Sequence, residues 1–186
     1  MIKFILHGGD SSSFCDENKK FFKTVFCNIK KEKILYIPFA QDMEKWKTSF
    51  LEEKIGLYIK NRKYNITVAS VKKIDLIIQI ISSKVIFIPG GDFLKLMPRI
   101  YFLKHLRFLF RNKIIVGVSA GTNIFSRYSY SQDYDDILEG LGFLNIKTIC
   151  HFDEENDIEK VKRLDKRGHK YEIIRLKEKE FMIMEI

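Results

Sequence analysis

The sequence predicts an α/β fold: a single domain with a doubly wound, mostly parallel sheet. Three observations support this prediction. Short apolar runs recur along the chain, segments with helical spacing lie between them, and no linker rich in Gly, Pro or Ser divides the chain. A length of 186 residues with 46% hydrophobic residues suits one domain, residues 1–186, with a substantial core.

The strands are predicted from apolar runs that are short, rich in β-branched residues and bounded by turn residues. Strands buried on both faces of a parallel sheet have this character. In chain order the predicted strands are 2–6, 34–38, 66–69, 85–89, 114–118, 146–149, 173–176 and 181–184.

The helices are predicted from apolar residues that recur on one stripe. In residues 14–29 this stripe holds Phe21, Phe22, Val25 and Phe26. Residues 43–61, 93–111 and 153–167 complete the main set, and residues 120–127 also have helical character. Because ligands of such sheets bind beyond the carboxyl ends of the strands, functional loops are expected there.

Composition excludes several classes of function. The formal net charge is +9, but basic residues are interleaved with acids, as in Lys30-Lys31-Glu32-Lys33, so no nucleic-acid partner is expected. The longest apolar runs, such as 74–81, fall well short of the roughly 20 residues that span a bilayer. The apolar stretch at the N-terminus is also too short for the hydrophobic region of a signal peptide. A cytoplasmic protein without a membrane partner is expected.

The cysteines indicate a reducing compartment. Cys15, Cys27 and Cys150 are odd in number and widely spaced, which fits neither a disulfide framework nor a paired zinc site. We therefore expect reduced thiols. Neither a metal nor any other cofactor is expected.

The most specific motif is Gly117-Val118-Ser119-Ala120-Gly121, between a predicted strand and a helical stretch. A Gly-x-Ser-x-Gly run in this position is the sequence form of a nucleophile elbow. The sharp turn strains the serine backbone and brings neighbouring chain close, so residues without a Cβ are needed on either side. The motif predicts an exposed Ser119 hydroxyl at a helix N-terminus, where N–H groups favour negative charge.

Two further loops follow predicted strands. Pro89-Gly90-Gly91-Asp92 places paired glycines where a backbone N–H is free to donate to a ligand. The strand at 146–149 ends in Cys150-His151, and a histidine there is a candidate base, because a serine nucleophile needs a nearby group to take its proton.

Taken in order, the sequences 88–93, 117–121 and 151–154 resemble serine peptidases of family S51, the aspartyl dipeptidase (dipeptidase E) group. The resemblance extends over nearly the whole chain, because it includes the early loop His7-Gly8-Gly9, the segment 35–40 and the tail 172–183. The tail is similar to the family's closing hairpin. It implies a class I glutamine amidotransferase-like (flavodoxin-like) fold with a C-terminal β-hairpin.

The resemblance implies a serine peptidase that hydrolyses small peptides by acyl transfer. Ser119 would be the nucleophile, His151 the general base and Glu178 the acid, with Glu180 as a near alternative. The N–H groups of Gly91 and Ala120 would form the oxyanion hole. The expected partner is a small peptide substrate, and a homodimer is compatible with the sequence.

Several other charged residues are candidates under the same resemblance. Family members carry acids a dozen or so positions after the serine, where this chain has Asp133, Asp135 and Asp136. Under the resemblance, one of these is an alternative to Glu178 for orienting the histidine, or a residue that touches the substrate. The family's Asn-Thr after the paired glycines is replaced by Asp92-Phe93, and an acidic Asp92 would repel a substrate carboxylate. A preference for N-terminal aspartate needs a cationic receptor, for which the candidates are Arg99, Arg127 and Arg163.

Three other readings stand beside the peptidase. One is a non-catalytic amidotransferase-like domain that binds a ligand or partner, which the altered Gly-Gly-Asp-Phe loop favours. Another is a serine esterase, in which the order Ser119, Asp135, His169 would serve as the triad. A cysteine enzyme using Cys150 is disfavoured, because adjacent strand residues point to opposite faces and Cys150 would point away from His151.

Overall fold

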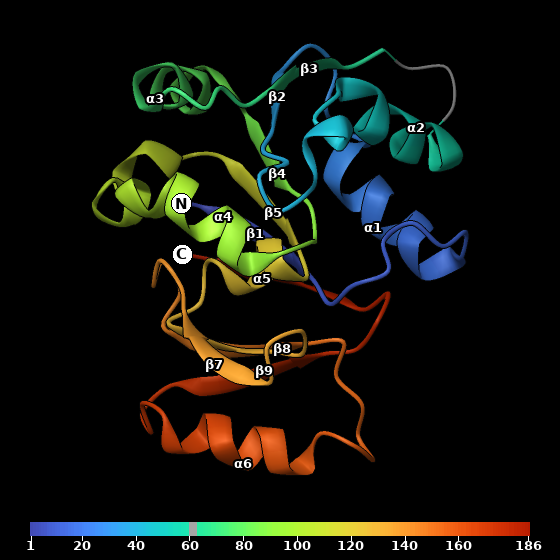
Figure 1. Ribbon diagram of the computed structural model, residues 1–186. Helices are drawn as coiled ribbons and strands as arrows, with labels where there is room; N and C mark the ends of the chain where they lie inside the picture. The colour runs from blue at the N-terminus through green and yellow to red at the C-terminus, as the bar shows by residue number, and fades with distance from the viewer. Residues whose placement is uncertain (60–62) are drawn as a thin grey trace.

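The computed structural model describes residues 1–59 and 63–186, and its larger sheet has six strands in the order β10-β1-β5-β4-β2-β3 (Figure 1). All neighbouring pairs are parallel except β10, which runs antiparallel to β1. The strands are β1 (Lys3–His7), β2 (Lys33–Tyr36), β3 (Asn65–Val68), β4 (Val85–Ile88), β5 (Ile114–Val118) and β10 (Phe181–Glu185).

A second sheet of four strands, in the order β7-β6-β8-β9, lies below the larger sheet in the view of Figure 1. Its strands are β6 (Tyr128–Ser131), β7 (Asp136–Glu139), β8 (Ile146–Cys150) and β9 (Glu172–Leu176). Strands β6, β8 and β9 are parallel, and β7 pairs antiparallel with β6. Helix α6 (Ile158–Lys166) covers one face of this sheet through a small core of Tyr130, Ile149 and Leu164.

The larger sheet carries helices on both faces because its side chains alternate between two cores. One core joins Ile5, Val116 and Phe87 of the strands to Phe21 and Leu51 of the helices α1 (Asp16–Phe26) and α2 (Thr48–Tyr58). The other core lies under the remaining helical elements. These are α3 (Lys73–Ser82), α4 (Phe93–Ile100), η2 (Tyr101–His105), η3 (Arg107–Phe110) and α5 (Ala120–Asn123).

All eight predicted strands are present within one or two residues of their predicted bounds. Two strands were not predicted. Strands β6 and β7 read Tyr-Ser-Tyr-Ser and Asp-Ile-Leu-Glu, so neither contains a continuous apolar run. The prediction of one sheet is wrong in one respect: β8, which precedes His151, belongs to the smaller sheet, while β5, which precedes Ser119, belongs to the larger one.

The predicted C-terminal β-hairpin is also wrong. Strand β9 pairs with β8, and β10 completes the edge of the larger sheet beside β1, so the turn between them crosses from one sheet to the other. This crossing is held by Gly8 N–H, which donates to Glu180 O at 2.9 Å, and by Lys179 N–H, which donates to Gly9 O at 2.9 Å. Strand β10 therefore pairs with β1 and not with β9, its neighbour in the sequence.

Helix bounds differ more from the prediction. The segment predicted at 43–61 is η1 (Met43–Lys45) followed by α2, and its last residues, 60–61, lie outside the described residues. Helix α4 contains Pro98 and continues as two short 3-10 turns, and α5 is a single turn. Helix α3 was not predicted, because every residue from Ile74 to Ile81 except Asp75 and Gln79 is apolar, which obscures the helical period.

Within the two described ranges, no helix combines the length and the apolar character needed to cross a membrane.

Candidate active site

Ser119 occupies the turn between β5 and α5 with φ 49° and ψ −110°. This conformation is strained for a residue with a Cβ, and such strain persists only where the surroundings impose it. The serine N–H donates to His7 O on the neighbouring strand at 2.9 Å, which fixes the turn against β1. The structure therefore confirms the strained elbow that the motif predicts.

The two elbow glycines are required by close backbone contacts. A Cβ on Gly117 would lie 2.2 Å from Gly121 O, and one on Gly121 would lie 2.1 Å from Ile88 O on β4. Both distances are far below van der Waals contact, so α5 starts close to the sheet only because these positions have no side chain.

His151 follows β8, and Glu178 lies in the turn between β9 and β10. The Nε2 atom of His151 is 2.8 Å from Ser119 Oγ, and its Nδ1 atom is 3.1 Å from Glu178 Oε1. An ionised carboxylate only accepts hydrogen bonds, so Nδ1 carries the proton and Nε2 is left to accept from the serine hydroxyl. The structure thus brings together the serine, the histidine and one of the two predicted acids.

The loop after β1 supports the histidine. Gly8 O accepts a hydrogen bond from His151 N–H at 3.1 Å. On its other side the loop is tied to His7, whose Nδ1 accepts from Gly9 N–H at 3.1 Å, while its Nε2 pairs with Asn18 Oδ1 at 3.0 Å. The predicted Gly-containing loop therefore holds His151 in place.

Two residues that line the cavity together with Ser119 have backbone N–H groups without an internal acceptor among the described residues. Across the residues that the structure describes, the amides of Gly91 and Ala120 donate to no protein oxygen. Gly91 has φ +138°, and a Cβ there would lie 2.3 Å from Ala40 O, so only glycine fits this loop. Both residues line the same cavity as Ser119, which is the arrangement an oxyanion hole requires.

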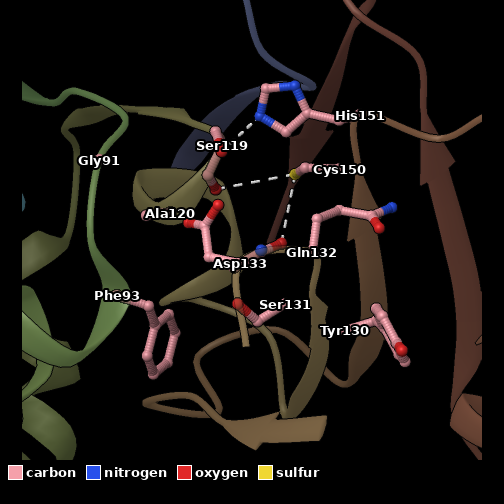
Figure 2. A pocket seen from close by; sticks show the side chains of 11 residues that line it. Gly91, Phe93, Ser119, Ala120, Tyr130, Ser131, Gln132, Asp133, Cys150 and His151 are labelled. Atoms are coloured by element: carbon pink, nitrogen blue, oxygen red, sulfur yellow. Dashed lines mark hydrogen bonds between the residues drawn. The ribbon is translucent and has the colours of Figure 1, made fainter. Parts of the chain in front are cut away.

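A small cavity of about 40 Å³ opens beside Ser119 (Figure 2). Its floor is formed by the elbow, and its walls come from the Gly91 loop, from the end of β8 and from the turn after β6. The lining residues are Gly91, Phe93, Ser119, Ala120, Asn123, Tyr130, Ser131, Gln132, Asp133, Cys150 and His151. This volume admits a small polar group or a short side chain.

The predicted acidic residues have different positions. Asp133 lines the cavity and has no hydrogen-bond or ion-pair partner among the described residues. Asp135 pairs with Tyr130 Oη and Arg163, and Asp136 Oδ1 accepts from Ile137 N–H. Of the three, only Asp133 is placed to touch a ligand bound at Ser119.

Asp92 and Glu180 have structural partners. Asp92 caps α4 by accepting from Leu94 N–H at 2.8 Å, and it also accepts from Tyr134 Oη at 2.8 Å. Its side chain is therefore not among those that line the cavity. Glu180 Oε2 accepts from Lys177 N–H at 2.9 Å and makes no contact with His151.

None of the three candidate arginines lines the cavity beside Ser119. Arg163 pairs with Asp135, and Arg127 packs on Gly142 and Tyr171. Arg99 lies over the rings of Trp46 and Phe39 in a separate pocket. The structure provides no cation at this cavity among them.

Cys150 is a buried thiol that supports the elbow. Its Sγ lies 3.2 Å from Asn123 Oδ1 and 3.7 Å from Ser119 O (Figure 2). Burial raises the pKa of the Cys150 thiol far above its ordinary value, so it stays protonated and donates. This protonation state makes Cys150 unsuited to act as a nucleophile.

Several site residues were missed by sequence reasoning. Asn123 lines the cavity and accepts from Thr148 Oγ1 at 2.8 Å, and Tyr134 fixes Asp92. No motif marks either residue. In the described ranges, no group of three or more His, Cys, Asp or Glu side chains is arranged to hold a metal ion.

The fold and the site together define the class of protein. A parallel sheet with a strained Ser elbow at the carboxyl end of a central strand, hydrogen-bonded to a histidine, is the architecture of hydrolases that use a nucleophile elbow. The chain matches the sequence profile of Peptidase family S51 over residues 4–185 and belongs to that family.

Two solved structures share the fold. A protein assigned as a peptidase E from Listeria monocytogenes EGD-e superposes with a TM-score of 0.67 at 15% identity, covering 100% of this chain and 99% of that one. A peptidase from an acI-B1 Actinobacterium gives a TM-score of 0.65 at 18% identity, covering 99% and 84%. No curated protein sequence matches the chain.

Proposed function

We propose that this chain is a serine peptidase that hydrolyses small peptides through Ser119, His151 and Glu178. Membership of a peptidase family supports hydrolysis of peptide bonds. The observation that carries the serine mechanism is the continuous hydrogen-bonded chain from Ser119 Oγ through His151 to Glu178, with distances of 2.8 and 3.1 Å.

The proposed reaction is acyl transfer in two steps. Ser119 Oγ attacks the peptide carbonyl carbon while His151 Nε2 takes its proton, and Glu178 stabilises the resulting imidazolium. The tetrahedral intermediate collapses as the imidazolium gives the proton to the leaving amine. Water then attacks the acyl-serine ester with His151 as the base again, which releases the acid and restores Ser119.

The backbone N–H groups of Gly91 and Ala120 have the second role. They would donate to the oxygen that becomes negative in each tetrahedral intermediate, and such donors contribute about 3–4 kcal/mol each to the rate. Both amides lack an internal acceptor in the described chain, so binding the oxyanion breaks no existing protein hydrogen bond.

The cavity favours a substrate with a small or positively charged group next to the scissile bond. Asp133 is its acidic side chain without an internal partner, and Asp133 points into the cavity beside Ser119 (Figure 2). A carboxylate there would attract the free α-ammonium group of a short peptide. The same charge would disfavour an acidic side chain on the substrate, which the aspartyl dipeptidases of the family accept.

Labelling with a fluorophosphonate probe tests the serine mechanism. We expect covalent labelling of the folded protein that is lost in Ser119→Ala and strongly reduced in His151→Gln. Absence of labelling in a correctly folded wild-type protein would overturn the proposal.

The alternatives are separated by the same geometry. In an esterase of the α/β-hydrolase type the acid precedes the histidine, whereas the histidine that contacts Ser119 is His151 and its acid follows it. A non-catalytic member would bind ligand in the cavity without reacting with the probe, so the labelling experiment distinguishes it from the peptidase.

A further inference from the structure

A second pocket lies next to the segment 39–41, which contacts the Gly91 loop. It has a volume of about 510 Å³ and is lined mainly by apolar surface. Its residues are Phe39, Gln41, Asp42, Met43, Trp46, Lys95, Pro98 and Arg99. Phe39 and Gln41 flank Ala40, whose carbonyl accepts from Asp92 N–H at 2.8 Å and contacts Gly91, so this pocket and the cavity share one loop.

The guanidinium of Arg99 lies over two aromatic rings at this pocket. Its guanidinium carbon lies 5.0 Å from the centre of the Trp46 ring and 5.6 Å from that of Phe39. The indole is fixed in turn, because its Nε1–H donates to Gln41 O at 3.0 Å. The ring faces attract the cation electrostatically, and this contact uses none of the guanidinium N–H donors.

The charge of Arg99 is not compensated inside the protein. Across residues 1–59 and 63–186, no carboxylate or carbonyl oxygen accepts a hydrogen bond from its guanidinium. The other two charged residues of the pocket, Asp42 and Lys95, neutralise each other through an ion pair at 2.9 Å. The pocket therefore carries a net positive charge on a pre-oriented group that binds carboxylates in a bidentate manner.

We propose that this pocket is a carboxylate-binding subsite, in which Arg99 binds the C-terminal carboxylate of a short peptide that passes over the Gly91 loop to Ser119. This inference rests on the proposed peptidase function. The apolar walls from Phe39, Met43 and Trp46 would take the last side chain of the peptide, while Asp133 lines the separate cavity at Ser119. A free carboxylate at a fixed reach from Ser119 would restrict the enzyme to short peptides.

The single tryptophan of the chain, Trp46, provides a direct readout, because it forms one wall of the pocket. In the Ser119→Ala background, which prevents turnover, intrinsic fluorescence is titrated with di-, tri- and tetra-alanine, each as the free acid and as the C-terminal amide. We expect a spectral change with the acids at one or more lengths and binding at least about ten-fold weaker for the matching amide.

Variants then assign the preference to Arg99. Arg99→Gln should abolish the difference between acid and amide, and Arg99→Lys should retain part of it. Arg107→Gln, an exposed arginine in η3 outside the pocket, is the matched control and should bind like the parent. Equal binding of acid and amide at every length, or a preference that survives in Arg99→Gln, would overturn the inference.

Fluorophosphonate labelling separates the two proposals. If Ser119 is labelled but Trp46 fluorescence shows no preference for the acid over the amide, the subsite proposal is wrong and the peptidase proposal stands. An acid preference that depends on Arg99 in a protein whose Ser119 is not labelled would keep the carboxylate site and remove the peptidase.

Discussion

The imidazole of His151 packs directly on Gly9. A Cβ at Gly9 would lie 2.1 Å from His151 Cε1 and 2.5 Å from Nδ1, and Gly9 itself has φ +144°, which L side chains rarely adopt. The glycine therefore sets the position of the histidine ring relative to both Ser119 and Glu178. Its role is steric, because it leaves space that the ring fills.

Replacing Gly9 by Ala should displace the ring and reduce peptidase activity. A displacement of about 1 Å between a base and its nucleophile lowers the rate about 100-fold, so kcat/KM for a short peptide should fall by about that factor. Steady-state kinetics check this, with circular dichroism to confirm folding. Activity equal to the wild type would show that the ring position does not depend on Gly9.

Removing the charge of Glu178 should slow the reaction without abolishing it. The Glu178 side chain is 56% exposed and that of His151 37%, so water takes over part of the stabilisation of the imidazolium in Glu178→Gln. We expect kcat to fall about 10- to 100-fold with KM nearly unchanged.

The matched control for this change is Glu180→Gln, two residues along the same turn. Glu180 contacts Lys177 N–H and not the histidine, so its kcat should stay close to that of the wild type. A larger loss of kcat in Glu180→Gln than in Glu178→Gln would assign the acid to Glu180.

Much of the fold was predictable because the inner strands of the larger sheet, β1, β2, β4 and β5, are buried on both faces over most of their length. Such strands must be apolar at every position, and β5 was predicted at its observed bounds, residues 114–118. Strand β6 was missed because half of its residues are serines that are buried with the sheet. The partners of β9 and β10 were not predictable from local pattern, since pairing with β8 and β1 depends on residues distant in sequence.

The site was predictable where a motif encodes backbone geometry. Ser119 and its glycines form such a motif, and His151 was identified by its position after a strand. The supporting contacts of Asn123, Tyr134 and His7 were missed, because a single polar residue has no pattern that reveals its partner. The separation of Arg99 from the Ser119 cavity likewise depends on the tertiary packing of Trp46 and Phe39.

Replacing Gly121 by Ala should destabilise the protein. The added methyl group would overlap Ile88 O, which is backbone and has no room to move, so α5 would have to shift away from β4. Overpacking of this kind costs about 1–3 kcal/mol of unfolding free energy, which urea denaturation measures.

Gly56→Ala is the control, because it makes the same chemical change in α2. A Cβ at Gly56 meets no atom within 4 Å, so the substitution should raise the unfolding free energy by about 0.5–1 kcal/mol through helix propensity. A destabilised Gly56→Ala together with an unaffected Gly121→Ala would contradict the steric account of the elbow.

The buried His7 should make stability depend on pH. Burial lowers the pKa of His7 from 6.5 to about 4, and its neutral form is fixed by Gly9 N–H on Nδ1 and Asn18 Oδ1 on Nε2. Between pH 4 and 6.5 the unfolded chain therefore binds more protons at this residue than the folded one does. The contribution of His7 to the free energy of unfolding is complete above about pH 6.5. It is lost as the pH falls toward 4, by about 3 kcal/mol in all.

Urea unfolding at intervals from pH 4.5 to 7 measures this dependence, which includes the contributions of the carboxylates. The part that belongs to His7 is the difference between the wild type and His7→Gln, and it should have a positive slope with pH. His105→Gln, which replaces an exposed histidine in η2, should reproduce the wild-type slope. If His7→Gln kept the full wild-type slope, the charge state of His7 would not be linked to folding, and the pH dependence of the unfolding free energy would come from other groups.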